Sequence, residues 1–451
     1  MSNVSPELLA RKRLSGSERL YGGAAFGVVW AGQVASLFGA HLAGFVLGVW
    51  VYQQTRSVTA FSLIYLFTVL PEIALLPVAG VIVDKFDRRW VMLVGVMGSG
   101  LCGFVLAALA LMGQLQLWHI YLMLMISSAF ESVQFPALSA SITLLVSREN
   151  LSRANGMVSL GTSIAMVVAP VLAGVFFQAL GLTRVLLINV GVYAFAVLTL
   201  CVVRIPQPEQ SSEANKVSRS FWREAVQVWR FVTGQRELLA LLMLFAITNF
   251  STGILQVLLP PFILSFTTPE ALGTIMSAGG VGVVAGSVLF SIWRGPRRRM
   301  HAIFIVGFVR GVVLFLAVLQ PSAVLIGTAA FIFLFCDPVI FTCSQTIWQT
   351  KVPAEVQGRA FAIRRLVAWS TLPLAYVVAG PLTDRVFEPW MGAQGPLARL
   401  VGGLVGTGPG RGIAVFFVVL GAVTVLAVIA GVLYQPLRDL ENRLPDVAAK
   451  C

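Results

Sequence analysis

Long apolar stretches separated by short polar turns run along the whole chain. Each stretch has about the length that a helix needs to cross a hydrocarbon core of ~30 Å at ~1.5 Å per residue. Twelve such segments can be placed, at 26–51, 60–83, 90–112, 118–146, 151–179, 182–203, 237–266, 270–293, 300–319, 322–350, 356–387 and 412–435. The pattern predicts an all-α membrane protein with twelve transmembrane helices.

The turn from Gly80 to Arg89 shows why these stretches must span a membrane. It reads Gly-Val-Ile-Val-Asp-Lys-Phe-Asp-Arg-Arg and lies between the second and third apolar segments. Charges inside a bilayer cost several kcal/mol each. The turn therefore lies at a membrane face, and the segments on either side cross the bilayer.

One connection is longer than the others and divides the chain. Residues 204–236 begin with Pro206 and Pro208 and are rich in Ser, Glu and Lys, a composition typical of a linker. We expect an N-terminal six-helix half with a polar tail at 1–203, a cytoplasmic linker at 204–236, and a C-terminal six-helix half with its tail at 237–451.

The composition agrees with a membrane protein and excludes several functions. Mean hydropathy is +0.87 and only 11% of residues are charged, against roughly a quarter in soluble proteins. The net charge of +13 comes from basic residues in short turns, so it does not indicate nucleic-acid binding. The sequence has no phosphate-binding loop, hydrolase nucleophile motif or metal-like cysteine spacing. We therefore expect no enzyme activity, no cofactor and no metal.

The distribution of Lys and Arg predicts the orientation. Turns on the side of the N-terminus hold 26 basic residues, and the opposite turns hold 5. The 26 include Lys351, Arg359, Arg364 and Arg365, which are assigned to one turn. Cytoplasmic loops carry the excess of basic residues. Both termini are thus predicted to lie in the cytoplasm, with the protein in the inner membrane of a bacterium.

The two halves share a weak repeat. An offset of 206 residues carries Gly80 and Arg88 onto Gly286 and Arg294, and the same offset carries Arg153 onto Arg359. Parallel repeats of this kind predict a substrate site near the middle of the membrane, between the halves.

The same turn resembles the signature of the major facilitator superfamily, Gly-x-x-x-Asp-(Arg/Lys)-x-x-(Arg/Lys)-(Arg/Lys). The matching residues are Gly80, Asp84, Lys85, Arg88 and Arg89. Stretches 118–121, 135–137, 151–156, 358–359 and 379–384 resemble the branch that contains macrolide-efflux proteins and bacterial siderophore exporters. The resemblance covers nearly the whole chain and implies the major facilitator fold and transport by alternating access.

Two features depart from that family. The antiporter signature of helix 5, Gly-Pro-x-x-Gly-Gly, is reduced to a form that keeps Pro170, Ala173 and Gly174. The arginine that many drug antiporters carry in helix 4 is absent. The first departure weakens the case for antiport slightly, and the second removes one proton-relay partner.

The resemblance also implies a gating role for the turn. Asp84 would dock at the start of helix 11, near residues 356–359, where unpaired backbone N–H groups and the helix dipole favour a carboxylate. Lys85, Arg88 and Arg89 would hold neighbouring acidic groups and the membrane surface. The alternative is that these charges only fix the topology.

Five ionisable residues fall near the centres of predicted helices: His41, Glu72, Glu131, Arg310 and Asp337. Such residues are costly at that depth and usually face protein or a water-filled cavity. All five are candidates for proton coupling. Each has a structural alternative: Asp337 and Arg310 as a neutralising pair, Glu72 as a partner for backbone groups freed by Pro71, and His41 as a packing residue. Glu131 has no basic partner on its own helix.

Amide and aromatic residues lie on the helices that line the cavity of the resembled fold. These cavity candidates are Gln33, Phe38, Phe130, Gln134, Asn249, Phe250, Gln256, Phe341 and Gln345. A mixed lining of this kind suits a bulky amphipathic ligand better than a sugar. Each of them could instead serve packing alone.

Together these features predict a monomeric secondary transporter that exports amphipathic small molecules through the lipid bilayer against an inward flow of protons. An uptake symporter on the same fold is the first alternative. A lipid flippase or a non-transporting membrane assembly factor is the second, and neither would need titratable groups at mid-membrane.

Overall fold

The computed structural model describes residues 22–205, 233–292, 295–352, 354–392 and 395–445, and these residues form helices with no β-strand. The first group of helices is α2 (Gly22–Thr55), α3 (Val58–Lys85), α4 (Arg88–Leu111), α5 (Leu117–Glu131), α6 (Gln134–Leu145), η1 (Arg148–Asn150) and α7 (Leu151–Val202). The second group is α9 (Arg236–Leu264), α10 (Pro269–Ile292), α11 (Arg299–Ala317), α12 (Ala323–Phe335), α13 (Asp337–Lys351), α14 (Ala354–Leu382), η3 (Thr383–Phe387), α15 (Glu388–Trp390), α16 (Pro396–Val405), α17 (Arg411–Leu433), α18 (Gln435–Arg438) and α19 (Leu440–Arg443).

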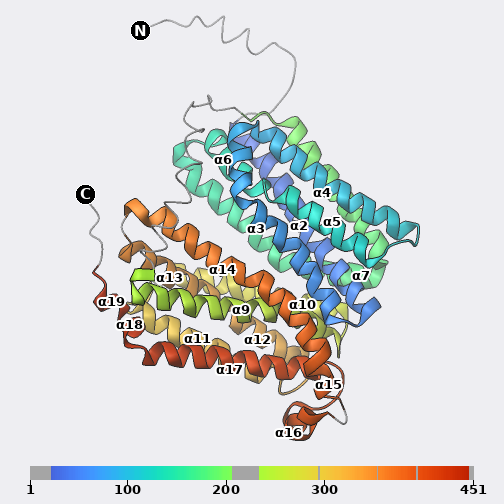
Figure 1. Cartoon of the computed structure of the whole chain (residues 1–451). Helices are drawn as coiled ribbons and strands as arrows, with labels where there is room; N and C mark the ends of the chain where they lie inside the picture. The colour runs from blue at the N-terminus through green and yellow to red at the C-terminus, as the bar shows by residue number, and fades with distance from the viewer. Residues whose placement is uncertain (1–21, 206–232, 293–294, 353, 393–394, 446–451) are drawn as a thin grey trace, which may run out of the picture.

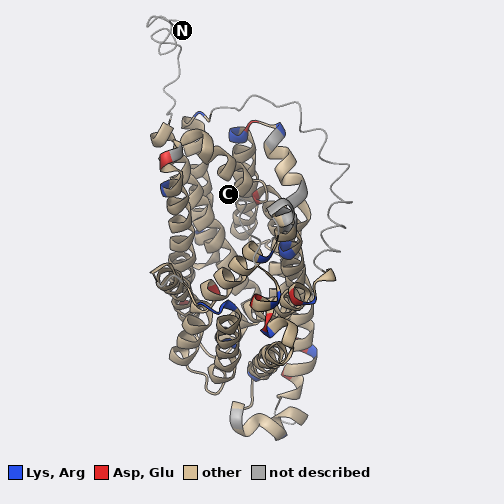
Figure 2. Cartoon of the chain, turned by 90° about the vertical axis from the view of Figure 1, so that its left-hand side faces the viewer, with Lys and Arg blue, Asp and Glu red and all other residues tan. Residues whose placement is uncertain are grey.

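The helices carry almost no charge along their lengths. Figure 2 shows Lys, Arg, Asp and Glu at only a few places on the ribbon, most of which is tan. Ten helices among the described residues are long and apolar enough to cross a membrane. The all-α membrane fold is therefore confirmed.

The count of twelve crossings remains a prediction. It requires α5 and α6 together to form one crossing. It also requires α7 to form two, and a straight helix of its 52 residues would be about 78 Å long. Gly181 interrupts α7 with a φ of 76° and a ψ of 172°, which falls at the predicted boundary between the fifth and sixth segments.

Two predicted helices are broken near their centres. The fourth ends at Glu131 and resumes at Gln134 as α6, while the tenth ends at Phe335 and resumes at Asp337 as α13. The sequence pattern predicted each of them as one continuous segment. The breaks place a carboxylate at corresponding points of the two segments.

The helices form two bundles, α2–α7 and α9–α17, which lie side by side (Figure 1). We call the end of the molecule that carries α15 and α16 the α15–α16 end. One buried cluster lies within the first bundle, including Val83 and Leu138, and another lies within the second, including Ala360 and Trp348. Most of the predicted linker 204–236 lies outside the described residues.

The bundles meet through a third buried cluster that both of them share. It joins Val58 and Phe61 of α3 to Ala375 and Ala379 of α14. The rings of Tyr65 and Tyr376 are 5.7 Å apart across the same boundary. These contacts use the first turns of α3 and the last turns of α14, so the bundles join near the α15–α16 end.

The helix 5 motif forms a second contact between the bundles. A Cβ on Gly174 would meet the backbone of Pro269 and Glu270, and a Cβ on Gly273 would meet the backbone of Pro170. Ala173 of the motif is fully buried, and Ser277 of α10 donates a hydrogen bond to the carbonyl of Val167 at 2.5 Å. The small residues therefore let α7 and α10 approach backbone to backbone.

The two glycines of the predicted repeat have different surroundings, which leads to a first prediction. A Cβ on Gly286 would press on the backbone carbonyl of Phe335, whereas a Cβ on Gly80 would meet no atom within 4 Å. We expect Gly286→Ala to lower the free energy of unfolding by about 1–3 kcal/mol through overpacking. Gly80→Ala should leave it unchanged or slightly higher, because alanine is the better helix former. Thermal unfolding of the two purified variants in detergent measures the difference, and equal melting temperatures would contradict it.

Candidate functional site

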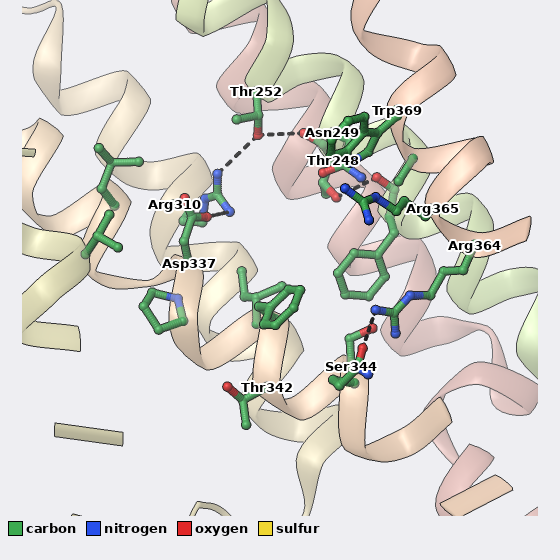
Figure 3. A pocket seen from close by; sticks show the side chains of 18 of the residues that line it. Thr248, Asn249, Thr252, Arg310, Asp337, Thr342, Ser344, Arg364, Arg365 and Trp369 are labelled. Atoms are coloured by element: carbon green, nitrogen blue, oxygen red, sulfur yellow. Dashed lines mark hydrogen bonds and ion pairs between the residues drawn. The ribbon is translucent and has the colours of Figure 1, made fainter. Parts of the chain in front are cut away.

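A cavity of about 1280 Å³ lies on the inner side of the second bundle (Figure 3). Side chains from α9, α10, α11, α13 and α14 line it, together with Leu334 of α12 and Met166 of α7. Five residues singled out from the sequence are among them: Asn249, Arg310, Asp337, Phe341 and Gln345. The structure thus brings these five to one space, although they come from three helices, α9, α11 and α13.

An ion pair occupies one wall of this cavity. Arg310 Nη1 lies 2.5 Å from Asp337 Oδ1, and Arg310 Nη2 donates to Thr252 Oγ1 at 3.1 Å. The guanidinium carbon lies 3.9 Å from the ring centroid of Phe333. Arg310 is buried, whereas the Asp337 side chain is 38% exposed. The carboxylate can therefore be reached from the cavity while it neutralises the arginine.

Two further arginines reach into the cavity from α14. Arg364 donates to Gln345 Oε1, and the Arg365 guanidinium lies 4.3 Å from the ring centroid of Trp369. Their assignment to a polar turn was wrong, because both lie within α14 and line the cavity (Figure 3). Removing them from the count of basic residues leaves the excess on the N-terminal side intact.

A smaller pocket of about 170 Å³ lies in the first bundle. Gln33, Glu131 and Gln134 line it. Glu131 accepts hydrogen bonds from Ser127 Oγ at 3.0 Å and Tyr193 Oη at 3.2 Å. The Nε2 atoms of Gln33 and Gln134 are buried without a hydrogen-bond partner among the described residues. Glu131 is thus held by neutral donors rather than by a basic residue.

The two carboxylates are related by the repeat of the chain. Glu131 is the last residue of α5 and Asp337 the first residue of α13, and the same offset of 206 residues that links Gly80 to Gly286 links them. It also links Phe135 to Phe341. Each bundle therefore carries one acid at the break of its fourth helix.

The remaining predicted cavity residues are not in the lining of either pocket. Phe38 and Phe250 are partly buried and pack against hydrophobic clusters. A Cβ on Gly98 would meet the Phe130 ring, so this ring packs against α4. Gln256 accepts a hydrogen bond from Tyr376 Oη at 3.1 Å. These four residues make packing or hydrogen-bond contacts where the structure places them.

His41 and Glu72 also lie outside the two pockets. His41 is an exposed residue of α2. Glu72 lies on α3 and interacts electrostatically with Arg365 of the second bundle and with Glu131 of the first. Glu72 therefore interacts with charged groups of both bundles.

The turn of the family signature is held within the first bundle. Arg88 Nη1 donates to the carbonyl of Ala140 at 2.7 Å, and Arg89 donates to the carbonyls of Leu200 and Cys201 at 2.8 and 2.9 Å. Lys85 is exposed at the end of α3. Arg89 thereby binds carbonyl oxygens in the last turn of α7, where a cation is favoured, and Arg88 joins the turn to the middle of α6.

The predicted contact of Asp84 with helix 11 cannot be placed. The side chains of Asp84 and of residues 354–356, 358 and 359 lie outside the described part of the structure, as does Arg294 of the repeat. The gating role of Asp84 stays a prediction.

A different aspartate joins the bundles at the α15–α16 end. Asp384 of η3 accepts hydrogen bonds from Ser57 Oγ at 2.7 Å and from the backbone N–H groups of Val58 and Thr59 at 3.0 and 2.9 Å. It caps the N-terminus of α3 from the other bundle. The sequence contained Asp384 in a family-like stretch, but a contact across more than 300 residues leaves no local signal.

The described residues contain no group of three or more His, Cys, Asp or Glu residues that could hold a metal ion.

Comparison with known proteins places the chain among membrane transporters. The sequence model of the Major Facilitator Superfamily matches residues 29–375. The chain is 25% identical over 370 residues to macrolide efflux protein A of Streptococcus pyogenes, which covers 80% of this chain and 90% of that protein. It is 23% identical over 345 residues to the multidrug efflux pump Tap of Mycolicibacterium fortuitum, which covers 74% of this chain and 83% of that protein.

Solved structures share the fold at low sequence identity. The nucleoside transporter NupG superposes with a TM-score of 0.64 at 14% identity, covering 89% of this chain and 97% of that one. The structure also superposes, with a TM-score of 0.64 at 15% identity, on a bacterial homologue of the human lysosomal transporter Spinster in an inward-facing and unoccupied conformation. The match covers 92% of this chain and 98% of that one.

Proposed function

The chain belongs to the major facilitator superfamily, and from this membership we propose that it exports amphipathic small molecules in exchange for protons. Relatives named as macrolide and multidrug efflux pumps support the outward direction. The observation that carries the proposal is the carboxylate at the helix break in each bundle, Glu131 and Asp337. Interrupted helices at corresponding positions of two repeats mark the binding site in transporters of this kind.

The contacts between the bundles support a transport cycle that alternates between two openings. Asp384, the shared buried cluster and the glycine contacts of α7 and α10 join the bundles toward the α15–α16 end. The excess of basic residues on the opposite side favours an orientation with that end outside the cell. In this orientation the bundles are joined on the outer side, which agrees with a cavity that an exporter loads from the cytoplasm.

The size and lining of the cavity support a bulky amphipathic cargo. Its volume of about 1280 Å³ exceeds the ~300–1,000 Å³ of common ligand pockets. Aromatic rings of Phe245, Phe341 and Trp369 share the lining with the amides of Asn249 and Gln345. Such a surface can contact a large apolar body and still orient a few polar groups.

Transport into inside-out membrane vesicles tests the proposal directly. Labelled macrolides, siderophores and fluorescent dyes should accumulate in vesicles that contain the protein when the interior is made acidic, and a protonophore should abolish the accumulation. Accumulation only in right-side-out vesicles would instead indicate uptake. Vesicles that accumulate none of these compounds under any gradient would contradict export.

Replacing Glu131 gives a second prediction, on coupling. Glu131→Gln removes the titratable group but keeps an oxygen that can accept from Ser127 and Tyr193. We expect gradient-driven accumulation to fall to the level of vesicles without the protein, while exchange down a cargo gradient continues. The control is Glu149→Gln, which changes an exposed acid of η1 in the same way. Unchanged gradient-driven accumulation in Glu131→Gln would show that Glu131 does not couple.

A further inference from the structure

The cavity of the second bundle contains more positive than negative charge. Three arginines line it, Arg310, Arg364 and Arg365, and Asp337 is the one acidic residue in its described lining. The Asp337 carboxylate is bound to Arg310 at 2.5 Å. The charge of Arg365 interacts with Glu72 of the other bundle. Within the described residues, Arg364 is left without an anionic partner.

The immediate contacts of Arg364 are neutral. One nitrogen, Nη2, donates to the amide oxygen of Gln345, and the guanidinium carbon lies 5.3 and 5.9 Å from the ring centroids of Phe361 and Trp348. The other nitrogen, Nη1, is buried and has no hydrogen-bond partner among the described residues. A guanidinium that is always charged therefore lines the cavity with one buried nitrogen that has no acceptor among the described residues.

The depth of Arg364 makes this arrangement costly without a ligand. It lies ten residues from the start of α14, which corresponds to about 15 Å along the helix, and its side chain lines the cavity there. A buried charge is stabilised only when it is paired and its donors are satisfied. An oxyanion in the cavity would provide both, because guanidinium groups bind carboxylate and phosphate oxygens with two parallel hydrogen bonds.

We infer that the cargo carries an oxyanion, such as a carboxylate, and that Arg364 binds it in the cavity. The inference rests on the proposed export function and specifies its substrate class. The ring of Phe361, which lines the cavity beside Arg364, would contact the apolar part of the same molecule. Arg365, which reaches into the cavity from the next position of α14 (Figure 3), adds a positive field that favours the same charge.

A pair of dyes that differ in one group tests this inference. Rhodamine 6G is an ethyl ester, and its hydrolysis gives the corresponding carboxylate on the same ring system. We expect the full-length protein in phosphatidylcholine nanodiscs to bind the carboxylate about tenfold more tightly than the ester, measured by fluorescence anisotropy, because hydrogen bonds from a guanidinium to a carboxylate are stronger than those to a neutral ester. Equal affinity for the two dyes, including no binding of either, would overturn the inference.

Variants assign the preference to Arg364. Arg364→Gln should reduce the affinity ratio to about one while leaving the ester's affinity unchanged, which also shows that the variant is folded. Arg364→Lys should keep part of the preference for the carboxylate, since the charge remains but bidentate hydrogen bonding is lost. Arg385→Gln removes an exposed arginine of η3 and should leave the ratio as in the wild type. An unchanged ratio in Arg364→Gln would overturn the assignment.

One additional measurement distinguishes a lipid phosphate from the cargo as the bound anion. Another distinguishes failure of the anion site from failure of export. If a lipid phosphate occupies Arg364, phosphatidylglycerol nanodiscs should abolish the preference for the dye carboxylate, which would overturn the assignment to cargo. Selective binding of the carboxylate without its transport in inside-out vesicles would contradict export and leave the site intact. Transport of both dyes without a charge preference would contradict the site and leave export intact.

Discussion

Asp384→Ala is expected to open the contact between the two bundles at the α15–α16 end. The Asp384 carboxylate accepts three hydrogen bonds from the first residues of α3, two of them from backbone N–H groups. A carboxylate in this position caps the helix and interacts with its dipole, and caps contribute about 0.5–2 kcal/mol. Because Asp384 is only partly buried, we expect a loss of about 1–2 kcal/mol from the closed arrangement, a population shift of roughly five- to thirtyfold.

Spin labels at Gln54 and Leu319 can measure this shift. Both residues are exposed and lie near the ends of α2 and α11, in different bundles. The labels would be placed in protein whose five native cysteines are replaced. Pulsed electron–electron distance measurements should show a longer-distance population in Asp384→Ala that is minor in the wild type, with Asp384→Asn between them.

A similar contact within one bundle provides the control. Glu441 accepts from the backbone N–H groups of Arg299 and Met300 at 3.3 and 3.1 Å, at the N-terminus of α11. Glu441→Ala removes a cap of the same kind but should leave the distance between the labels unchanged. A wild-type distance distribution in Asp384→Ala would mean that the buried cluster alone holds the bundles closed.

Helix positions were predictable to within a few residues because the bilayer imposes a length. The segment predicted at 90–112 is α4 at Arg88–Leu111, and the one predicted at 237–266 is α9 at Arg236–Leu264. The breaks after Glu131 and before Asp337 were not predicted, since hydropathy averages over them. Only the repeat contained a signal: the offset that relates Gly80 to Gly286 also relates the two acids.

The side chains that face the cavity were harder to predict. A helix that is apolar all round has no periodicity to show which face is buried, and Phe130 and Phe341 could be distinguished only by structure. Arg364 and Arg365 were assigned to a turn because basic residues near a helix end resemble topology signals. Their role in the cavity depends on the start of α14 at Ala354, which places both arginines well inside the helix.

Substitutions in the Arg310–Asp337 pair distinguish most clearly between a structural role and a role in proton coupling. Removing one partner of a buried pair typically costs about 3–5 kcal/mol, and we expect less here, about 1–3 kcal/mol, because the Asp337 side chain is 38% exposed. Arg310→Gln and Asp337→Asn should each lower the melting temperature of the purified protein. The double variant should recover most of the loss, because it leaves no unpaired charge.

Transport by the same three variants then shows whether Asp337 also carries protons. If Arg310 and Asp337 only neutralise each other's charge, the double variant should regain gradient-driven accumulation together with its stability. We expect instead that stability returns while accumulation in acidic inside-out vesicles stays absent, because neither remaining group can release a proton. Arg438→Gln, which breaks the exposed pair with Asp439, should change both measurements little. Recovery of both properties in the double variant would assign Asp337 to structure and leave Glu131 as the coupling residue.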